Sequence, residues 1–222
     1  VGSVATYPFG RGGFEVSKLE EATAKRYLPA AELSKLKSAT ANNPQCEYAR
    51  KLFLFSYYCY GISFIDMAML TAAHIKQMED GDYIVYKRQK IKRQKGVKPI
   101  SIKITPAIRQ LIESLQAASP TVDDFLLPVV TRSGYTGERL YMHIRTRYSK
   151  YQKYLRLLAE ELGIDFHLTS YVSRHTAAMT LQRNHIPREV ISQMLGHADL
   201  ETTNVYLDSF DNGVINEAAK VL

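Results

Sequence analysis

The periodicity of hydrophobic residues changes once along this chain and then changes back. Residues 80–104 alternate apolar with polar side chains and are rich in β-branched and aromatic types, which predicts strands at 80–90 and 98–104. The basic segment 91–97 joins them as a hairpin loop. On both sides of this stretch, apolar residues recur at helical spacing. The pattern predicts a mostly α fold with a small antiparallel β-sheet, in the α+β class.

Local signals place the ends of several helices. Gly61 is suited to end a helix over 46–61, and Ser63 to cap the start of another over 63–75. Gly196 is suited to close the helix that precedes it. The other predicted helices cover 28–39, 106–118, 140–162, 170–184, 187–195, 199–207 and 212–222, with a loop at 120–138.

The length of 222 residues is enough for one large domain or two small ones. Residues 1–20 contain four glycines and little periodicity, so we expect a linker or edge segment there and a single domain over 21–222. No apolar run approaches the roughly 18 residues that a membrane span needs. Cys46 and Cys59 have neither metal-ligand nor redox spacing, which favours reduced thiols and a cytoplasmic location.

Positive charge is concentrated in two places in a chain of net charge +7. Eight basic residues and no acidic one lie between Lys87 and Lys103, and a second basic set lies at 139–156. Such clusters indicate a polyanionic partner such as nucleic acid, with an ordinary solvated face as the alternative. The residues predicted to contact DNA are Lys87, Arg88, Lys92, Arg93, Lys95, Arg145 and Arg147.

Four residues, Lys90, Arg174, His197 and Tyr206, have side chains suited to breaking a phosphodiester bond. A tyrosine can attack phosphorus, and the planar fork of an arginine binds phosphate. A histidine can move a proton near neutral pH, and a lysine can protonate a leaving oxygen. Taken singly, Arg174 suits a surface position, His197 a helix cap and Tyr206 an apolar anchor.

Taken together, these residues resemble the C-terminal signature of the tyrosine recombinase (phage integrase) family. The segment 173–207 contains an "RHT" box, then "LGH", then "TTNVY", with Tyr206 nine positions after His197. The "GISFIDMAML" stretch looks like the helix that starts the catalytic core, so the resemblance covers roughly residues 20–215. It implies a domain that cuts and rejoins DNA through a 3′-phosphotyrosyl intermediate, without a metal or other cofactor.

The resemblance assigns a role to each matching position. Tyr206 is the nucleophile, Arg174 the second phosphate-binding arginine, and His197 the second histidine. Asp66 and His175 support the site. The proton-donating lysine of the hairpin is Lys90, with Lys87, Lys92 and Lys95 as rivals.

Two catalytic positions depart from the family pattern. Ser63 stands where the family usually has its first arginine, and Tyr171 where it has a histidine or lysine. A subgroup of mobile-element integrases lacks that first arginine and shares "G-[MI]-S-F-x-D"; many of its members have an arginine where this chain has Tyr60. The chain is therefore a site-specific recombinase, a DNA-binding member with weak or no catalysis, or a type IB topoisomerase-like enzyme. A metal nuclease is disfavoured because HExxH and paired-carboxylate spacings are absent from the sequence.

The resemblance also implies partners. They are double-stranded DNA at attachment or recombination sites, further copies of the chain in a tetramer on DNA, and accessory DNA-bending proteins. An N-terminal core-binding domain is expected before the segment 1–20. The expected location is the bacterial cytoplasm, associated with the nucleoid when bound to DNA, with no membrane partner.

The C-terminal segment offers a test of the expected assembly. Its apolar residues recur at helical spacing over 214–222, suited either to a neighbouring copy or to the chain's own core. If the segment packs on a neighbour, deleting 213–222 should spare binding to a single DNA site and impair joining of two, as measured by gel shift. A large fall in melting temperature together with loss of single-site binding would assign the segment to its own core.

Overall fold

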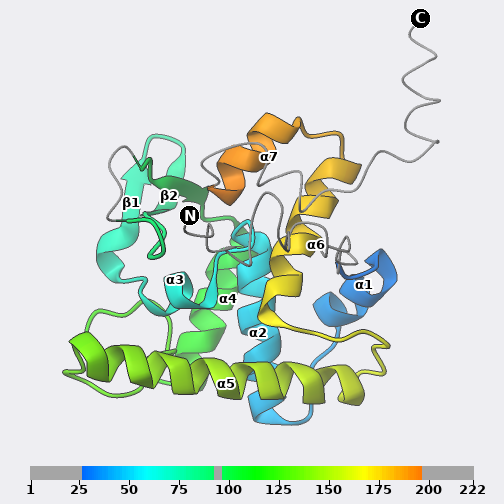
Figure 1. Ribbon diagram of the computed structural model, residues 1–222, viewed down its shortest axis with the longest axis horizontal. Helices are drawn as coiled ribbons and strands as arrows, with labels where there is room; N and C mark the ends of the chain where they lie inside the picture. The colour runs from blue at the N-terminus through cyan, green and yellow to red at the C-terminus, as the bar shows by residue number, and fades with distance from the viewer. Residues whose placement is uncertain (1–26, 93–96, 197–222) are drawn as a thin grey trace, which may run out of the picture.

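A computed structural model describes residues 27–92 and 97–196. In this part of the chain, helices pack around a central helix and a small sheet lies to one side of them (Figure 1). The elements are α1 (Ala30–Ser38), α2 (Pro44–Tyr58), α3 (Phe64–Ala68), the 3₁₀ turn η2 (Ala72–His74), β1 (Ile75–Met78), β2 (Gly81–Tyr86), β3 (Ile100–Lys103), α4 (Pro106–Ala118), α5 (Gly137–Glu161), α6 (Ser170–Arg183) and α7 (Arg188–Leu195). The expected mostly helical fold with a small antiparallel sheet is confirmed.

Helix α2 forms the centre of the core. Its sequence is apolar around most of its circumference, and Leu52, Phe53 and Phe55 are fully buried. It packs against α4, α5 and α6, which lie around it (Figure 1). Within the described residues, no helix is both long and apolar enough to cross a membrane.

The sheet has three antiparallel strands in the order β1-β2-β3, so the prediction of two strands was incomplete. The predicted helix over 63–75 was wrong beyond Ala68, where α3 ends. Residues 70–72 instead form an isolated antiparallel β-bridge with loop residues 124–126, and this extended pairing ends the helical geometry. Ile75 then pairs opposite Ile84, and β1 becomes an edge strand of the sheet.

The predicted helix ends are mostly confirmed. The Ser63 hydroxyl accepts a hydrogen bond from the Asp66 amide and caps α3, and Gly196, at φ +64°, closes α7. Helix α2 ends at Tyr58, earlier than predicted, and the Gly61 amide donates to the Ser56 carbonyl. In this termination Tyr60, at φ +57°, takes the left-handed position that the prediction gave to Gly61.

Gly61 brings the end of α2 against the backbone of α6. A Cβ atom at position 61 would lie 2.4 Å from Arg174 Cα and 2.6 Å from Arg174 Cβ, far inside contact distance. The residue also has φ +71°, which disfavours any side chain. Both the space and the backbone angle therefore require glycine at this position.

We expect Gly61→Ala to lower the free energy of unfolding by clearly more than the cost of placing an alanine at a positive φ angle. Gly163→Ala is the matched control, because Gly163 has φ +60° and open space around the position of its Cβ. The angle costs about 1–2 kcal/mol in either variant. The forced separation of α2 from α6 adds about 1–3 kcal/mol at position 61. Denaturant unfolding measures both values, and equal losses in the two variants would contradict the close packing.

Candidate active site

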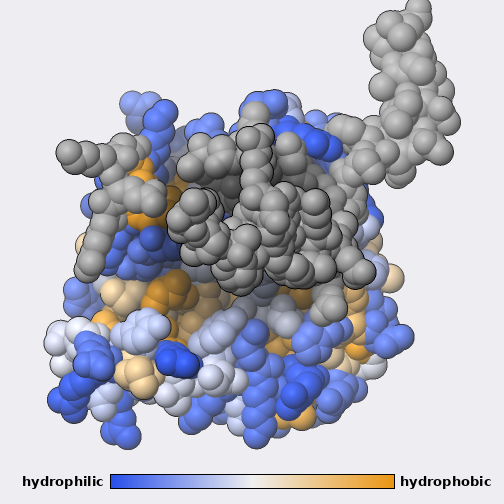
Figure 2. Space-filling model, in the orientation of Figure 1, coloured by the Kyte–Doolittle hydropathy of each residue, from blue (hydrophilic) through white to orange (hydrophobic). Residues whose placement is uncertain are grey.

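An open cleft lies where α3, the base of the β2–β3 hairpin, α5 and the start of α6 meet. Its volume is about 420 Å³. Five of the predicted site residues line it, namely Ser63, Arg88, Arg145, Tyr171 and Arg174. On the face shown in Figure 2, hydrophobic side chains gather between α3 and α5, with hydrophilic side chains along the outer surface of α5. The cleft therefore combines an apolar floor with three guanidinium groups.

Arg174 is the most deeply buried cation of the cleft, with only 4% of its surface exposed. Its Nη1 donates to the Gly61 carbonyl oxygen at 3.0 Å, and its Nη2 donates to the Leu195 carbonyl oxygen at 2.5 Å. Burial, and next the charge of Arg88, lower the pKa of Arg174 to about 10. The guanidinium is still charged at neutral pH, and the two carbonyls fix its plane.

Asp66 attaches the hairpin to α3. Its Oδ1 accepts a hydrogen bond from the Gln89 amide at 2.7 Å, and its Oδ2 accepts one from the Ser63 hydroxyl at 2.6 Å. Asp66 is itself buried. The carboxylate thereby fixes the first residues after β2.

Arg88 stands between this anchor and the end of α7. Its Nη1 donates to the Gly196 carbonyl oxygen at 3.3 Å. A Cβ on Gly196 would lie 3.3 Å from Arg88 Cδ and 2.4 Å from Ile100 Cδ1, so the end of α7 rests on both the hairpin and β3. His197, the next residue in the chain, lies outside the described residues.

Tyrosine side chains form part of the cleft wall. Tyr171 is 52% exposed, and its ring makes an edge contact with the His175 ring at 4.8 Å between centroids. Burial of its inner part raises the pKa of the Tyr171 hydroxyl. Sequence reasoning missed Tyr141 and Tyr148, which line the cleft from α5. Their spacing with Arg145, at i, i+4 and i+7, is the signal that places all three on one helix face.

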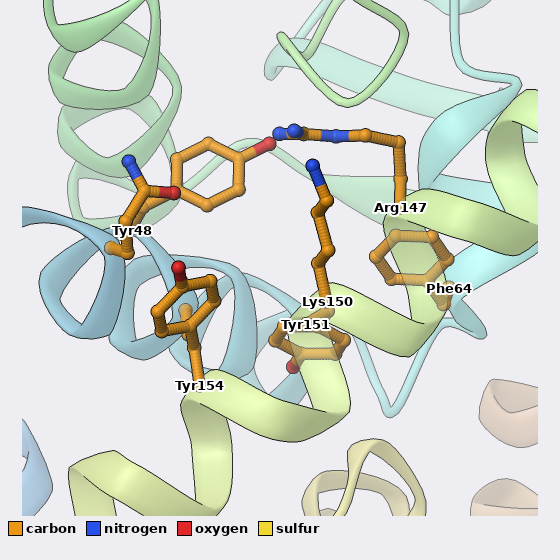
Figure 3. Close-up of a pocket in the computed structure, with 8 residues that line it drawn as sticks. Tyr48, Phe64, Arg147, Lys150, Tyr151 and Tyr154 are labelled. Carbon is orange, nitrogen blue, oxygen red and sulfur yellow. The ribbon is translucent and has the colours of Figure 1, made fainter.

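The other predicted residues are not in the cleft lining. Lys87, Lys90 and Lys92 are exposed on the hairpin. Arg147 lines a separate hollow between α2 and α5, where it and Lys150 extend toward Tyr48 (Figure 3). The Arg147 guanidinium carbon lies 5.8 Å from the centre of the Tyr48 ring. Arg93, Lys95, His197 and Tyr206 lie outside the described residues.

No group of three or more histidine, cysteine, aspartate or glutamate side chains arranged to hold a metal ion occurs within residues 27–92 and 97–196. Cys46 and Cys59 are both buried free thiols. Burial raises the pKa of both thiols above the ordinary value. They therefore belong to the core and not to the cleft.

The sequence is similar to curated recombinases. The tyrosine recombinase XerD of Halalkalibacterium halodurans is 41% identical over 54 residues, which is 24% of this chain and 18% of the relative. The tyrosine recombinase XerD of Brucella abortus is 30% identical over 121 residues, which is 51% of this chain and 36% of the relative. The matched region thus spans less than half the length of either relative.

Solved structures share the fold. The XerA recombinase superposes with a TM-score of 0.59 at 21% identity, covering 87% of this chain and 64% of the other. The Tn1549 transposon integrase in complex with transposon right end DNA gives a TM-score of 0.64 at 12% identity, covering 94% and 70%. The sequence also matches the Phage integrase family over residues 26–212. With most of its length inside that match, this chain belongs to the phage integrase family of tyrosine recombinases.

Proposed function

We propose that this chain is the catalytic domain of a site-specific DNA recombinase that forms a 3′-phosphotyrosyl intermediate through Tyr206. The observation that carries the proposal is the cleft in which Arg88, Arg145 and Arg174 converge on an otherwise apolar floor. Clustered guanidinium groups bind phosphate, and a partly apolar site strengthens that attraction. Arg174 and Arg88 donate hydrogen bonds to the carbonyl oxygens of Leu195 and Gly196 at the end of α7. His197 follows directly in the sequence, and Tyr206 comes nine residues later.

In the proposed cleavage step, one phosphodiester bond is exchanged for another, so the energy of the broken DNA bond is retained in the phosphotyrosyl bond. The Tyr206 phenol oxygen attacks the scissile phosphorus and forms a phosphotyrosyl bond, while the bond from phosphorus to the 5′ oxygen breaks. The phenol proton is passed on through His197, and the hairpin lysine, with Lys90 as the first candidate, protonates the departing 5′ oxygen. Rejoining is the same step in reverse, with the 5′ hydroxyl of a partner strand as the attacking group.

The role proposed for Arg174 is to hold the non-bridging phosphate oxygens. Negative charge grows on those oxygens as phosphorus is attacked, so a fixed guanidinium stabilises the transition state more than the ground state. Its two hydrogen bonds to backbone carbonyls keep the group in place before DNA binds. Because no reorganisation is needed during the reaction, the stabilisation is available at once.

The proposed partner is double-stranded DNA at a recombination site. The XerH recombinase and the Tn1549 integrase, which share this fold, were solved bound to DNA. Exchange of strands requires two cleaved duplexes to be held together, so we propose assembly into a tetramer on DNA, aided by DNA-bending proteins. The segment after Tyr206 is the proposed contact between copies.

A covalent protein–DNA adduct through Tyr206 is the expected result when the chain meets DNA without divalent metal. The substrate is a pool of nicked duplexes with randomised sequence around the nick, in buffer containing a chelator. A nick just downstream of the cleavage point lets the short fragment that carries the leaving 5′ hydroxyl diffuse away, which traps the intermediate. Denaturing electrophoresis detects the adduct, and peptide mapping identifies the modified residue.

Tyr206→Phe is the matched control, since it removes only the attacking oxygen. It should retain DNA binding and lose the adduct. An adduct on another residue, or equal trapping by both proteins, would refute the assignment of Tyr206. Binding without any adduct would instead favour a DNA-binding member with weak or no catalysis. Relaxation of supercoiled DNA without strand exchange between duplexes would favour the topoisomerase-like activity.

DNA binding should weaken steeply with salt. Each neutralised phosphate contributes about −0.9 to the slope of log K against log salt on duplex DNA. Arg145→Ala should therefore remove about one phosphate contact, which makes the slope shallower by about 0.9. It should weaken binding to all DNA sequences by the same factor. Lys76→Ala, which removes an exposed cation from the edge strand β1, is the control and should leave the slope unchanged. A wild-type slope near zero would exclude the basic clusters as the DNA-binding face.

A further inference from the structure

Position 63 leaves the cleft without one of the cations expected there. The Ser63 hydroxyl is already used in two hydrogen bonds within its own helix: it accepts one from the Asp66 amide, which caps α3, and donates one to Asp66 Oδ2. If the chain cleaves DNA as proposed above, the phosphate would then have only Arg174 from the two arginine positions that the family pattern provides. Losing one such donor costs about 10²–10³ in rate. Two other guanidinium groups line the cleft, those of Arg88 and Arg145.

Arg88 is placed and held for that role. It lines the same cleft as Ser63 and Arg174, although it comes from the hairpin and not from α3. Its backbone is fixed by the hydrogen bond from the neighbouring Gln89 amide to Asp66. Its side chain is half-buried and is held along Gly196, with Nη1 donating to the Gly196 carbonyl. Asp66 thus joins Ser63 on α3 to the hairpin residue that follows Arg88.

The charges around Arg88 favour an anion in the cleft. Among the described residues Arg88 makes no ion pair, and both oxygens of Asp66 already accept other hydrogen bonds. Arg88 is close enough to Arg174 that its charge lowers the pKa of Arg174, second only to burial. Two like charges in a partly dehydrated cleft repel each other. A phosphate bound between the two guanidinium groups would attract both of them and offset that repulsion.

Arg145 fits this role less well than Arg88. It also lines the cleft, but it projects from α5 and is exposed to solvent. No hydrogen bond from its side chain to another described residue holds it in place. Arg88, in contrast, is fixed at both its backbone and its guanidinium, so less conformational entropy is lost when it binds phosphate. Arg145 is better suited to a neighbouring phosphate of the backbone.

We propose that Arg88 supplies the second guanidinium to the scissile phosphate, in place of the arginine that Ser63 replaces. The inference rests on the proposed recombinase function. It assigns Arg88 to the reacting phosphate, whereas a cation that contacts flanking DNA would change affinity alone.

The test uses a nicked duplex whose sequence was trapped as an adduct on Tyr206 in the experiment above. On this duplex, the rate of adduct formation is compared between wild type and variants. Arg88→Ala should slow formation of the adduct by about 10²–10³, with a smaller effect on affinity. Arg88→Lys should fall between the two, because a lysine keeps the charge and loses the fork. Lys76→Ala removes an equal charge outside the cleft and should form the adduct at the wild-type rate.

A neutral phosphate separates a direct contact from a structural role. Replacing one non-bridging oxygen of the scissile phosphate by a methyl group removes the negative charge that Arg88 would stabilise. On this methylphosphonate duplex, the ratio of the wild-type rate of adduct formation to that of Arg88→Ala should then fall toward one. A variant that merely misfolds the hairpin would remain as defective on the neutral duplex as on the charged one.

A second variant tests the replacement itself. Ser63→Arg combined with Arg88→Ala should recover part of the lost rate, while Ser63→Ala combined with Arg88→Ala controls for loss of the α3 cap. An undiminished deficit on the methylphosphonate duplex, or normal trapping by Arg88→Ala, would overturn the role of Arg88 while leaving Tyr206 catalysis intact. Absence of any adduct with wild type would overturn both proposals.

Discussion

The arrangement of the cleft depends on one buried cation bound to two backbone carbonyls. Arg174 joins the loop after α2, through Gly61, to the end of α7, through Leu195. These segments are more than a hundred residues apart in sequence. Desolvating a guanidinium is costly unless its donors are satisfied, so the fold has to bring both carbonyls to it. The same contacts leave the side chain oriented in the cleft, which makes both the stability of the fold and the proposed phosphate binding depend on one residue.

Glycine makes both arginine positions possible. Arg174 packs against Gly61, and Arg88 packs along Gly196, each glycine having a positive φ and almost no space for a side chain. A glycine in the left-handed region at the end of a helix exposes its carbonyl group, because it has no Cβ atom to block the approach of another side chain. The two guanidinium groups are thus placed by glycines that contribute a backbone carbonyl and no side chain.

Much of this architecture was predictable because its signals are local. Capping by Ser63 and closure by Gly196 depend on residues within one turn, and the strands at β2 and β3 alternate over enough residues to be recognised. Strand β1 was not predictable in this way. It has only four residues, three of them exposed, and it forms because distant residues 124–126 end the preceding helical pattern. That interaction is tertiary and leaves no periodicity in the sequence.

The candidate site divides in the same way. Resemblance to the family identified Ser63, Tyr171 and Arg174, and the fold brings the three together. Arg88 was grouped with the hairpin lysines, because composition cannot distinguish a cation held in a cleft from one on the surface. Arg145 and Arg147 were grouped for the same reason, although residues two apart on a helix point in different directions. Only the packing of α5 decides which of them faces the cleft.

Helix α5 also sets a length scale. A helix rises about 1.5 Å per residue, so the basic side chains between Arg139 and Arg156 extend over roughly 25 Å. Base pairs of duplex DNA are stacked about 3.4 Å apart, which makes this distance equal to roughly seven base pairs. That is less than one helical turn of the duplex. A straight rod of this length beside DNA meets the backbone on a single side, so any contacts made by α5 are confined to one face of the duplex.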